Sequence, residues 1–165
     1  MTVQRTAFYD RHVALGGKIV EFGGYEMPVQ YGGIIEAHAR VRTAVGVFDV
    51  SHMGEVEVWG RDALAFVQHV TINDAARLSE GRVQYSAMCY PDGGIVDDLL
   101  VYHMGDHYML VINAANTAKD IEWLHQQLSG DVKLKDRSND ISLLAVQGPH
   151  SLATLQKLTA ADLSA

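Results

Sequence analysis

Cysteine is nearly absent from this chain of 165 residues: Cys89 is the only one, so no disulfide can form within the chain. The sequence also lacks a run of about 18 consecutive apolar residues, which a membrane-spanning helix needs. Its first residues lack the apolar stretch of a secretory signal peptide. These absences argue against a disulfide-stabilised secreted domain and against a membrane protein, and they predict a cytoplasmic protein.

Positive charge is also scarce in the sequence. Its 13 Lys and Arg residues face 20 Asp and Glu residues, which gives a formal net charge of -7. Nucleic acids and anionic membrane surfaces bind to basic stripes, so neither is expected as the main partner. A small anionic ligand is still compatible with this balance, because a few local cations are enough to bind one.

What is present is an ordinary globular composition, 48% hydrophobic and 20% charged, with enough apolar residues for a sizeable core. Segments with helical and with strand periodicity alternate, and several strands follow one another through tight turns. Such hairpins beside single helices predict an α+β fold with mixed or antiparallel sheets and flanking helices. The chain stops at Ala165 soon after a helix begins, so we expect residues 1–165 to be a truncated piece of a longer fold.

The periodicity also predicts where individual elements lie. Helices are expected at residues 5–15, 34–44, 60–70 and 117–128 and from Pro149 onward, and strands at residues 18–22, 46–50, 54–59, 83–90, 95–104, 108–112, 132–136 and 141–146. Residues 27–33 contain a proline and two glycines and are expected to form an irregular loop.

Two adjacent aspartates, Asp97 and Asp98, stand near the start of the strand expected at residues 95–104. Successive side chains of a strand point to opposite faces, so the two carboxylates should point apart. Leu99 and Val101 share the face of Asp97 and make it apolar. A carboxylate on such a face is costly unless it is paired, hydrogen-bonded or used. Asp97 is therefore a candidate for chemistry, although capping of the preceding turn explains it equally well.

The residue opposite Asp97 in the hairpin depends on the length of the loop. A three-residue loop at residues 92–94 would place Asp97 opposite Cys89 and on one face with Tyr85. That arrangement would suit an aromatic ligand with an N–H group to hold. A two-residue turn would place Asp97 opposite Met88 instead, and the sequence does not decide between the two registers.

Other polar residues give weaker signals. Asn113 ends the strand expected at residues 108–112, near the edge that carries Asp97, but a helix-start signal explains it equally well. Ser51 and His52 are neighbours, yet adjacent strand residues point apart and no Gly-x-Ser-x-Gly motif is present, which argues against a serine nucleophile. The eight histidines show no metal-ligand spacing, and no phosphate-binding loop occurs. No metal is therefore expected.

Three segments carry a resemblance to a known family. Residues 48–53 (Phe-Asp-Val-Ser-His-Met), 93–98 (Gly-Gly-Ile-Val-Asp-Asp) and 145–149 (Ala-Val-Gln-Gly-Pro) resemble aminomethyltransferase, the T-protein of the glycine cleavage system, in order and approximate spacing. Residues 27–31 and 73–74 fit the same pattern. The resemblance covers nearly the whole chain, which matches the N-terminal portion of the family's folate-binding region, about half of the family's usual length.

The resemblance implies a tetrahydrofolate-dependent transfer. Members of this family take the aminomethyl group carried on the lipoyl arm of H-protein, pass its one-carbon unit to tetrahydrofolate and release ammonia. Residue matching gives Asp97 the catalytic role, set against the reactive nitrogens of the folate. Met53, Tyr85 and Asn113 match further positions that line the folate cavity. The family's later acidic and arginine residues lie past Ala165, so this chain alone is expected to be inactive.

Three alternatives differ from the transferase. A non-catalytic folate-binding factor of iron–sulfur cluster maturation has the same fold, but the complete run at residues 93–98 favours the transferase. A folate-dependent demethylase carries a similar module behind a flavin domain, and the start of this chain at Met1 on the first helix argues against it. A plain interaction domain with a buried aspartate is the third, and it predicts that Asp97→Asn leaves activity unchanged.

Overall fold

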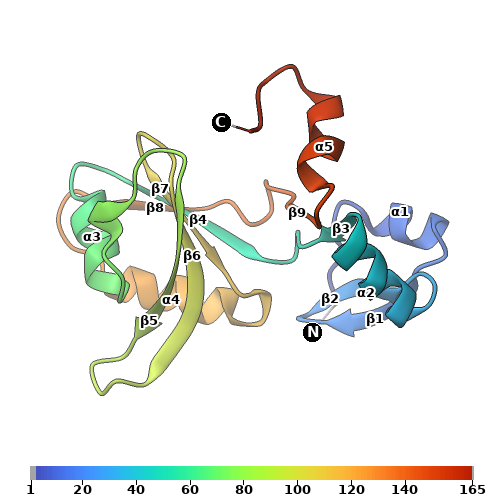
Figure 1. The fold of residues 1–165 in the computed structure, drawn as a ribbon. Helices are drawn as coiled ribbons and strands as arrows, with labels where there is room; N and C mark the ends of the chain where they lie inside the picture. The colour runs from blue at the N-terminus through green and yellow to red at the C-terminus, as the bar shows by residue number, and fades with distance from the viewer. Residues whose placement is uncertain (1–2, 165) are drawn as a thin grey trace. The chain divides into compact units, whose positions relative to one another are not determined.

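The computed structural model describes residues 3–164 and divides into two compact units (Figure 1). Unit 1 combines the first part of the chain, up to His52, with the last part from Ser142 onward. Unit 2 is the continuous segment Met53–Ile141. No helix among the described residues is long and apolar enough to cross a membrane.

Unit 2 is built on a five-stranded sheet with the order β5-β6-β7-β4-β8. Its strands are β4 (Gly54–Trp59), β5 (Val83–Cys89), β6 (Ile95–His103), β7 (Tyr108–Ile112) and β8 (Lys133–Asp136). All neighbouring strands of this sheet run antiparallel. The expected α+β class with antiparallel sheets is therefore confirmed.

The helices α3 (Ala63–Val70) and α4 (Thr117–Gln126) supply the apolar cover of one face of this sheet. The shared core includes alternate residues of the strands and the buried positions of both helices: Val56, Val58, Leu99, Val101, Leu110, Ile112, Phe66, Val67, Trp123 and Leu124. Fully burying one such side chain contributes roughly 1.5–3 kcal/mol. This core stabilises unit 2 and fixes the position of α4 over the sheet.

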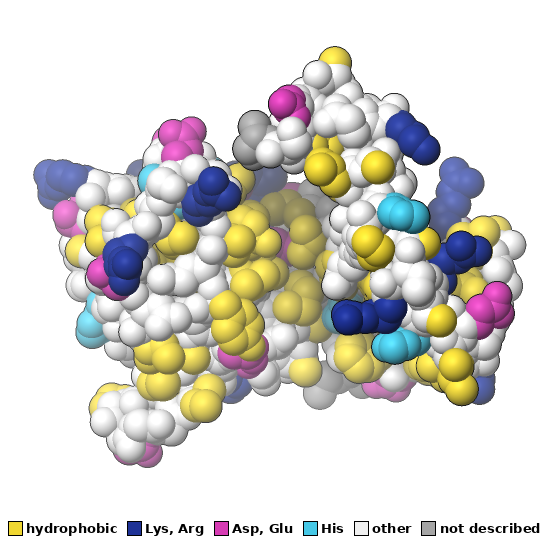
Figure 2. All heavy atoms as spheres, in the orientation of Figure 1, with side chains coloured by type: hydrophobic (Ala, Val, Ile, Leu, Met, Phe, Trp, Pro, Cys, Tyr) yellow, Lys and Arg dark blue, Asp and Glu magenta, His cyan; other side chains and the backbone are white. Residues whose placement is uncertain are grey.

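The described residues of unit 1 form two two-stranded sheets, three short α-helices and one 3-10 helix (Gln156–Leu158). Strand β1 (Lys18–Phe22) pairs with β2 (Tyr25–Gln30), and β3 (Gly46–Asp49) pairs with β9 (Leu144–Gln147). The helices are α1 (Tyr9–Ala14), α2 (Ile34–Thr43) and α5 (Ser151–Leu155). Among the described residues of unit 1, Met27 is the only buried hydrophobic residue, at 7% exposed. Hydrophobic side chains are correspondingly visible at the molecular surface (Figure 2).

A polar network compensates in part for this small apolar core. The buried Asp49 accepts hydrogen bonds from Thr6 Oγ1 at 2.6 Å, His12 Nε2 at 2.8 Å and the Ser51 amide at 3.0 Å. With Nε2–H of His12 donating to Asp49, its Nδ1 accepts from the Tyr31 hydroxyl at 2.6 Å. Burial alone would raise the pKa of Asp49, but these donors lower it. The network ties α1 and the end of the first hairpin to β3.

Most of the expected elements are confirmed to within a few residues, with two differences. The prediction of an irregular loop at residues 27–33 is wrong, because residues up to Gln30 belong to β2. Strands β1 and β2 form a two-stranded sheet, so both are edge strands. An edge strand tolerates a proline such as Pro28. The first helix is shorter than expected and begins at Tyr9, although the periodicity extends back to residue 5.

Candidate functional site

Asp97 lies near the start of β6, on the face of the sheet that α4 covers, and is 6% exposed. The loop before it is closed by a hydrogen bond of 2.7 Å from the Tyr90 amide to the Gly94 carbonyl. Cys89 then pairs with Ile95, and Met88 pairs with Asp97. One extra residue, Val96, is therefore inserted in β6 as a β-bulge. Bulges re-aim neighbouring side chains, and this one sets the direction of Asp97.

The observed pairing of β5 with β6 decides between the two hairpin registers that the sequence left open. The placement of Asp97 opposite Cys89 is wrong, and so is the shared face with Tyr85 that followed from it. Asp97 lies opposite Met88, as the two-residue turn predicted, but it reaches this place through a three-residue loop and a bulge. Tyr85 pairs with Leu100 and donates a hydrogen bond from its hydroxyl to the carboxylate of Asp98.

Two asparagines hold the carboxylate of Asp97. Its Oδ1 accepts from Nδ2 of Asn113 and from Nδ2 of Asn116, each at 3.0 Å, and its Oδ2 lies 3.4 Å from the Asn113 amide nitrogen. Both asparagines belong to the short segment that joins β7 to α4. Burial would raise the pKa of Asp97, but hydrogen bonds from Asp120, Asn113 and Asn116 lower it. The site is therefore arranged to keep Asp97 ionised in spite of its burial.

Asp120 is a second buried carboxyl group at this site, and it is absent from the residues expected from the sequence. It lies on α4 and is fully buried, and each of the two carboxyl groups shifts the pKa of the other. Lys119 Nζ contacts its Oδ1 at 2.8 Å and also donates to the carbonyl of Val96 at the bulge. Burial and the neighbouring Asp97 raise the pKa of Asp120 to about 7, against the opposing effect of Lys119. The signal was available, because helical periodicity puts Asp120 on the same face as Leu124.

The remaining expected site residues gather at the same end of the sheet. Gly54 pairs with Ile112 at the end of the β4–β7 register, and the half-buried Met53 and Asn113 are the next residues of the chain beyond this pair. Nδ2 of Asn113 also contacts Oδ1 of Asp98 at 2.9 Å. Tyr85 is 64% exposed and joins this group only through Asp98, on the face opposite to Asp97.

Gly54 allows the start of α4 to lie against the sheet. A Cβ atom at this position would come within 2.8 Å of both Thr117 Oγ1 and Ile112 Cγ1. Thr117 is the first residue of α4, and its hydroxyl donates to the Asn113 carbonyl at 3.2 Å. The absence of a side chain at Gly54 thus helps to place Asn113 and α4 around Asp97.

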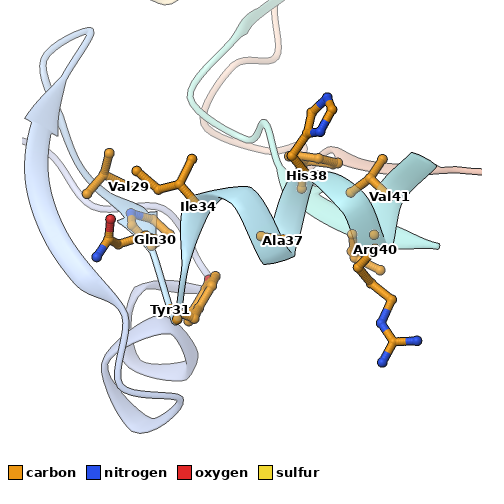
Figure 3. Close-up of a pocket in the computed structure, with 13 residues that line it drawn as sticks. Val29, Gln30, Tyr31, Ile34, Ala37, His38, Arg40 and Val41 are labelled. Carbon is orange, nitrogen blue, oxygen red and sulfur yellow. The ribbon is translucent and has the colours of Figure 1, made fainter. Parts of the chain in front are cut away.

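A separate hollow of about 470 Å³ lies in unit 1 between β2, α2 and β3 (Figure 3). Apolar side chains such as Val29, Ile34 and Val41 line it, with His38 and Arg40 among the polar ones. No carboxylate lines this hollow, and none of the expected site residues does. Among residues 3–164, no group of three or more His, Cys, Asp or Glu side chains is arranged to hold a metal ion.

Comparison with known proteins identifies the family. The sequence model of the GCVT N-terminal domain matches residues 8–165, so the chain belongs to this family. The aminomethyltransferase of Bacillus subtilis (strain 168) is 54% identical over 164 residues, which are 99% of this chain and 45% of that protein. The aminomethyltransferase of Bacillus velezensis is 56% identical over 163 residues, 98% of this chain and 44% of that protein.

A solved structure agrees with these relatives. The crystal structure of glycine cleavage system aminomethyltransferase T from Bartonella henselae matches with a TM-score of 0.85 and 31% identity, over 94% of this chain and 43% of that one. The resemblance to aminomethyltransferase is confirmed, and so is the expectation of an N-terminal portion. The chain spans less than half the length of the relatives that it matches.

Proposed function

We propose that this chain supplies the catalytic carboxylate of a tetrahydrofolate-dependent aminomethyltransferase of the glycine cleavage system. The observation that carries the proposal is Asp97, a buried carboxylate that two asparagine side chains keep ionised. Such a group accepts a hydrogen bond from an N–H group of a ligand, and the N10–H of tetrahydrofolate is one. The names of the relatives support this transferase over the iron–sulfur maturation factor and the demethylase module.

In the proposed reaction the donor is lipoylated H-protein, which carries the aminomethyl group on a sulfur of its lipoyl arm. The carbon–sulfur and carbon–nitrogen bonds of that group break, with their electron pairs going to sulfur and to nitrogen. The carbon forms new bonds to N5 and N10 of tetrahydrofolate. Of the two protons lost from N5 and N10, one completes the thiol and the other completes ammonia, and the products are 5,10-methylenetetrahydrofolate, dihydrolipoyl H-protein and ammonia.

The role of Asp97 in this reaction is to orient N10 and to help move its proton. By accepting the N10–H hydrogen bond, the carboxylate turns the lone pair of N10 toward the aminomethyl carbon. We propose that Met53, Tyr85 and Asn113 line the folate cavity, with Met53 and Asn113 near Asp97 and Tyr85 on the opposite face beside Asp98. We place the reaction in the cytoplasm, with tetrahydrofolate as the acceptor substrate and no metal.

The decisive experiment changes one carboxylate to its isosteric amide in the full-length protein. Asp97→Asn should reduce formation of 5,10-methylenetetrahydrofolate from aminomethyl-loaded H-protein by about 100-fold or more, because it removes the proton acceptor. The matched control is Asp106→Asn, which changes an exposed carboxylate in the turn between β6 and β7. Circular dichroism should show both variants folded. An Asp97→Asn protein with normal turnover contradicts the proposal.

A second experiment uses the chain of 165 residues itself. Because the chain spans less than half of its relatives, we expect it to bind tetrahydrofolate weakly and to turn over negligibly. Titration calorimetry measures this binding directly. Submicromolar affinity of residues 1–165 for tetrahydrofolate would be incompatible with the expectation that further segments complete the cavity.

A further inference from the structure

Asp97 and Asp120 are two buried carboxyl groups, and Asp120 lies one turn of α4 after Asn116, whose side chain donates to Asp97. Carboxylate oxygens only accept hydrogen bonds, so two carboxyl groups bond to each other only when one of them is protonated. Two adjacent like charges in a buried place would also repel strongly. The interaction between the two groups lowers the pKa of Asp97 and raises that of Asp120, as expected for a pair that holds one proton.

The surroundings of the two residues show which one holds this proton. Asp97 receives two side-chain amide donors, from Asn113 and Asn116, which favour its charged form. Asp120 is fully buried, and its Oδ2 receives no hydrogen bond from any donor in the described part of the chain. A buried oxygen without a donor is costly as an acceptor but is satisfied once it carries a proton that it can donate.

We propose that Asp120 is a positioning residue for Asp97: its protonated carboxyl group donates a hydrogen bond to the Asp97 carboxylate and fixes its charge and orientation. This inference rests on the proposed function, because it assigns a partner to the carboxylate that the transfer uses. Asp120 keeps its proton throughout the reaction and touches no substrate. Its effect on the transfer is exerted only through Asp97.

Charged groups around the pair tune this arrangement. Lys119 Nζ lies 2.8 Å from Oδ1 of Asp120, which favours loss of the proton, but the lysine side chain is 43% exposed and its charge is screened by water. Tyr90, which flanks the hairpin loop, lies near Lys119. Asp98 accepts a hydrogen bond from the same Asn113 side-chain amide that donates to Asp97. Burial and Asp97 outweigh Lys119, and the pKa of Asp120 rises.

The consequence is a dependence of turnover on pH that belongs to Asp120. Below the raised pKa of Asp120, its protonated carboxyl group donates a hydrogen bond to Asp97. Above that pKa, Asp120 is ionised and places a second negative charge beside Asp97. The kcat of the full-length enzyme should therefore fall as the pH rises through about 7. In Asp120→Asn the side-chain amide donates in the same direction but does not titrate. This variant should keep turnover at pH about 6 within roughly threefold of the wild type and should lose the alkaline fall.

Asp120→Ala removes the donor altogether. It should lower kcat about 10- to 100-fold, the loss of a hydrogen bond to a charged group, with a smaller change in KM for tetrahydrofolate. Glu122→Gln is the matched control, because it changes an exposed carboxylate on the same helix. If Asp120→Ala does not fold, the pH profile of Asp120→Asn still decides. An unchanged alkaline limb in Asp120→Asn overturns the inference.

A measurement without turnover separates this inference from the proposed function. The ¹³C resonance of the Asp120 carboxyl group, identified by its loss in Asp120→Asn, should titrate near neutral pH in full-length protein. Titration in the ordinary aspartate range overturns the inference even if the enzyme is active. Conversely, normal turnover by Asp97→Asn overturns the proposed function, and the positioning role falls with it, although the shared proton would still be seen by this resonance.

Discussion

Asn113 donates a hydrogen bond of 3.0 Å from Nδ2 to Oδ1 of Asp97. The same amide also reaches Oδ1 of Asp98 at 2.9 Å, on the strand that neighbours β7. One residue after a strand thus holds two carboxylates whose side chains leave β6 on opposite faces. Asn113 is the point at which the buried side of the sheet is connected to the exposed side that carries Tyr85.

Removing this amide should weaken the charged state of Asp97. In full-length Asn113→Ala, the pKa of Asp97 should rise toward its ordinary value, because one of its side-chain donors is lost. Turnover should fall about 10- to 100-fold, as expected for a lost hydrogen bond to a charged group. Steady-state kinetics and carboxyl NMR titration measure the two effects. Asn139→Ala, at an exposed asparagine, is the control. Wild-type kinetics in Asn113→Ala would show that Asp97 does not depend on this contact.

Tyr85 offers two separable features, its ring and its hydroxyl group. If the ring is a wall of the folate cavity, Tyr85→Ala should weaken tetrahydrofolate binding about tenfold in the full-length protein, the value of an aromatic stacking contact. Tyr85→Phe keeps the ring and loses only the bond to Asp98, so its dissociation constant should stay within about threefold of the wild type. Val83→Ala truncates another exposed side chain of the same strand. Equal binding by Tyr85→Ala and the wild type would exclude the ring as a wall.

The sequence predicts the local part of the fold well. The hairpins β5-β6 and β6-β7 follow from alternating periodicity around turns that need glycine, and Gly93 and Gly105 do have positive φ angles of 89° and 96°. The order of the strands does not follow in the same way. Strand β4 lies next to β7 and β8, and β3 pairs with β9 about a hundred residues further along the chain. Such pairings depend on tertiary packing that no local pattern records.

The candidate site is likewise only partly predictable from the sequence, as individual residues show. The sequence singles out Asp97 by its apolar strand face and Asn113 by the family resemblance, and the structure joins the two by a hydrogen bond. The register of the hairpin was not predictable, because the extra residue Val96 produces no sequence signal that distinguishes a bulge from regular pairing. The sequence does not single out Asp120, because its importance lies in its electrostatic interaction with Asp97, and sequence does not say which turn of α4 lies over β6.

Glu55 provides a test of stability against pH that is independent of the site. It is fully buried on β4, and both carboxyl oxygens lack a hydrogen-bond partner among the described residues. Burial and the nearby Asp136 raise the pKa of Glu55 to about 7. Because the pKa of Glu55 is higher in the folded protein than in the unfolded chain, the folded protein has its full stability below the unfolded pKa near 4.5. It loses part of this stability as the pH rises through about 7.

Glu55→Gln should therefore remove this loss. Its free energy of unfolding, measured by urea denaturation, should exceed that of the wild type by on the order of 1–3 kcal/mol at pH about 8 and should be close to it at pH about 4. Glu36→Gln changes an exposed glutamate of α2 and should alter the stability at neither pH. A Glu55→Gln variant that is less stable than the wild type at pH 8 would mean that the ionised carboxylate is used in the folded protein.

The difference in apolar burial between the units predicts a difference in backbone protection. Unit 2 contains the large core around Leu110, whereas Met27 is the only buried hydrophobic residue among the described residues of unit 1. Backbone amides exchange slowly where opening must break such a core. In the chain of 165 residues, hydrogen exchange measured by mass spectrometry should be slowest in β4, β6 and β7 and fastest in α2 and in the hairpin of β1 and β2.

A substitution in this core sharpens the test. Leu110→Ala should destabilise unit 2 by about 2–5 kcal/mol through loss of buried area and creation of a cavity, and it should speed exchange in β6 and β7 together because they share that core. Ile35→Ala, at a side chain that is 86% exposed on α2, should leave their exchange unchanged. If α2 exchanges as slowly as β7 in the unmodified chain, then unit 1 is stabilised by more than its own polar network and Met27 provide.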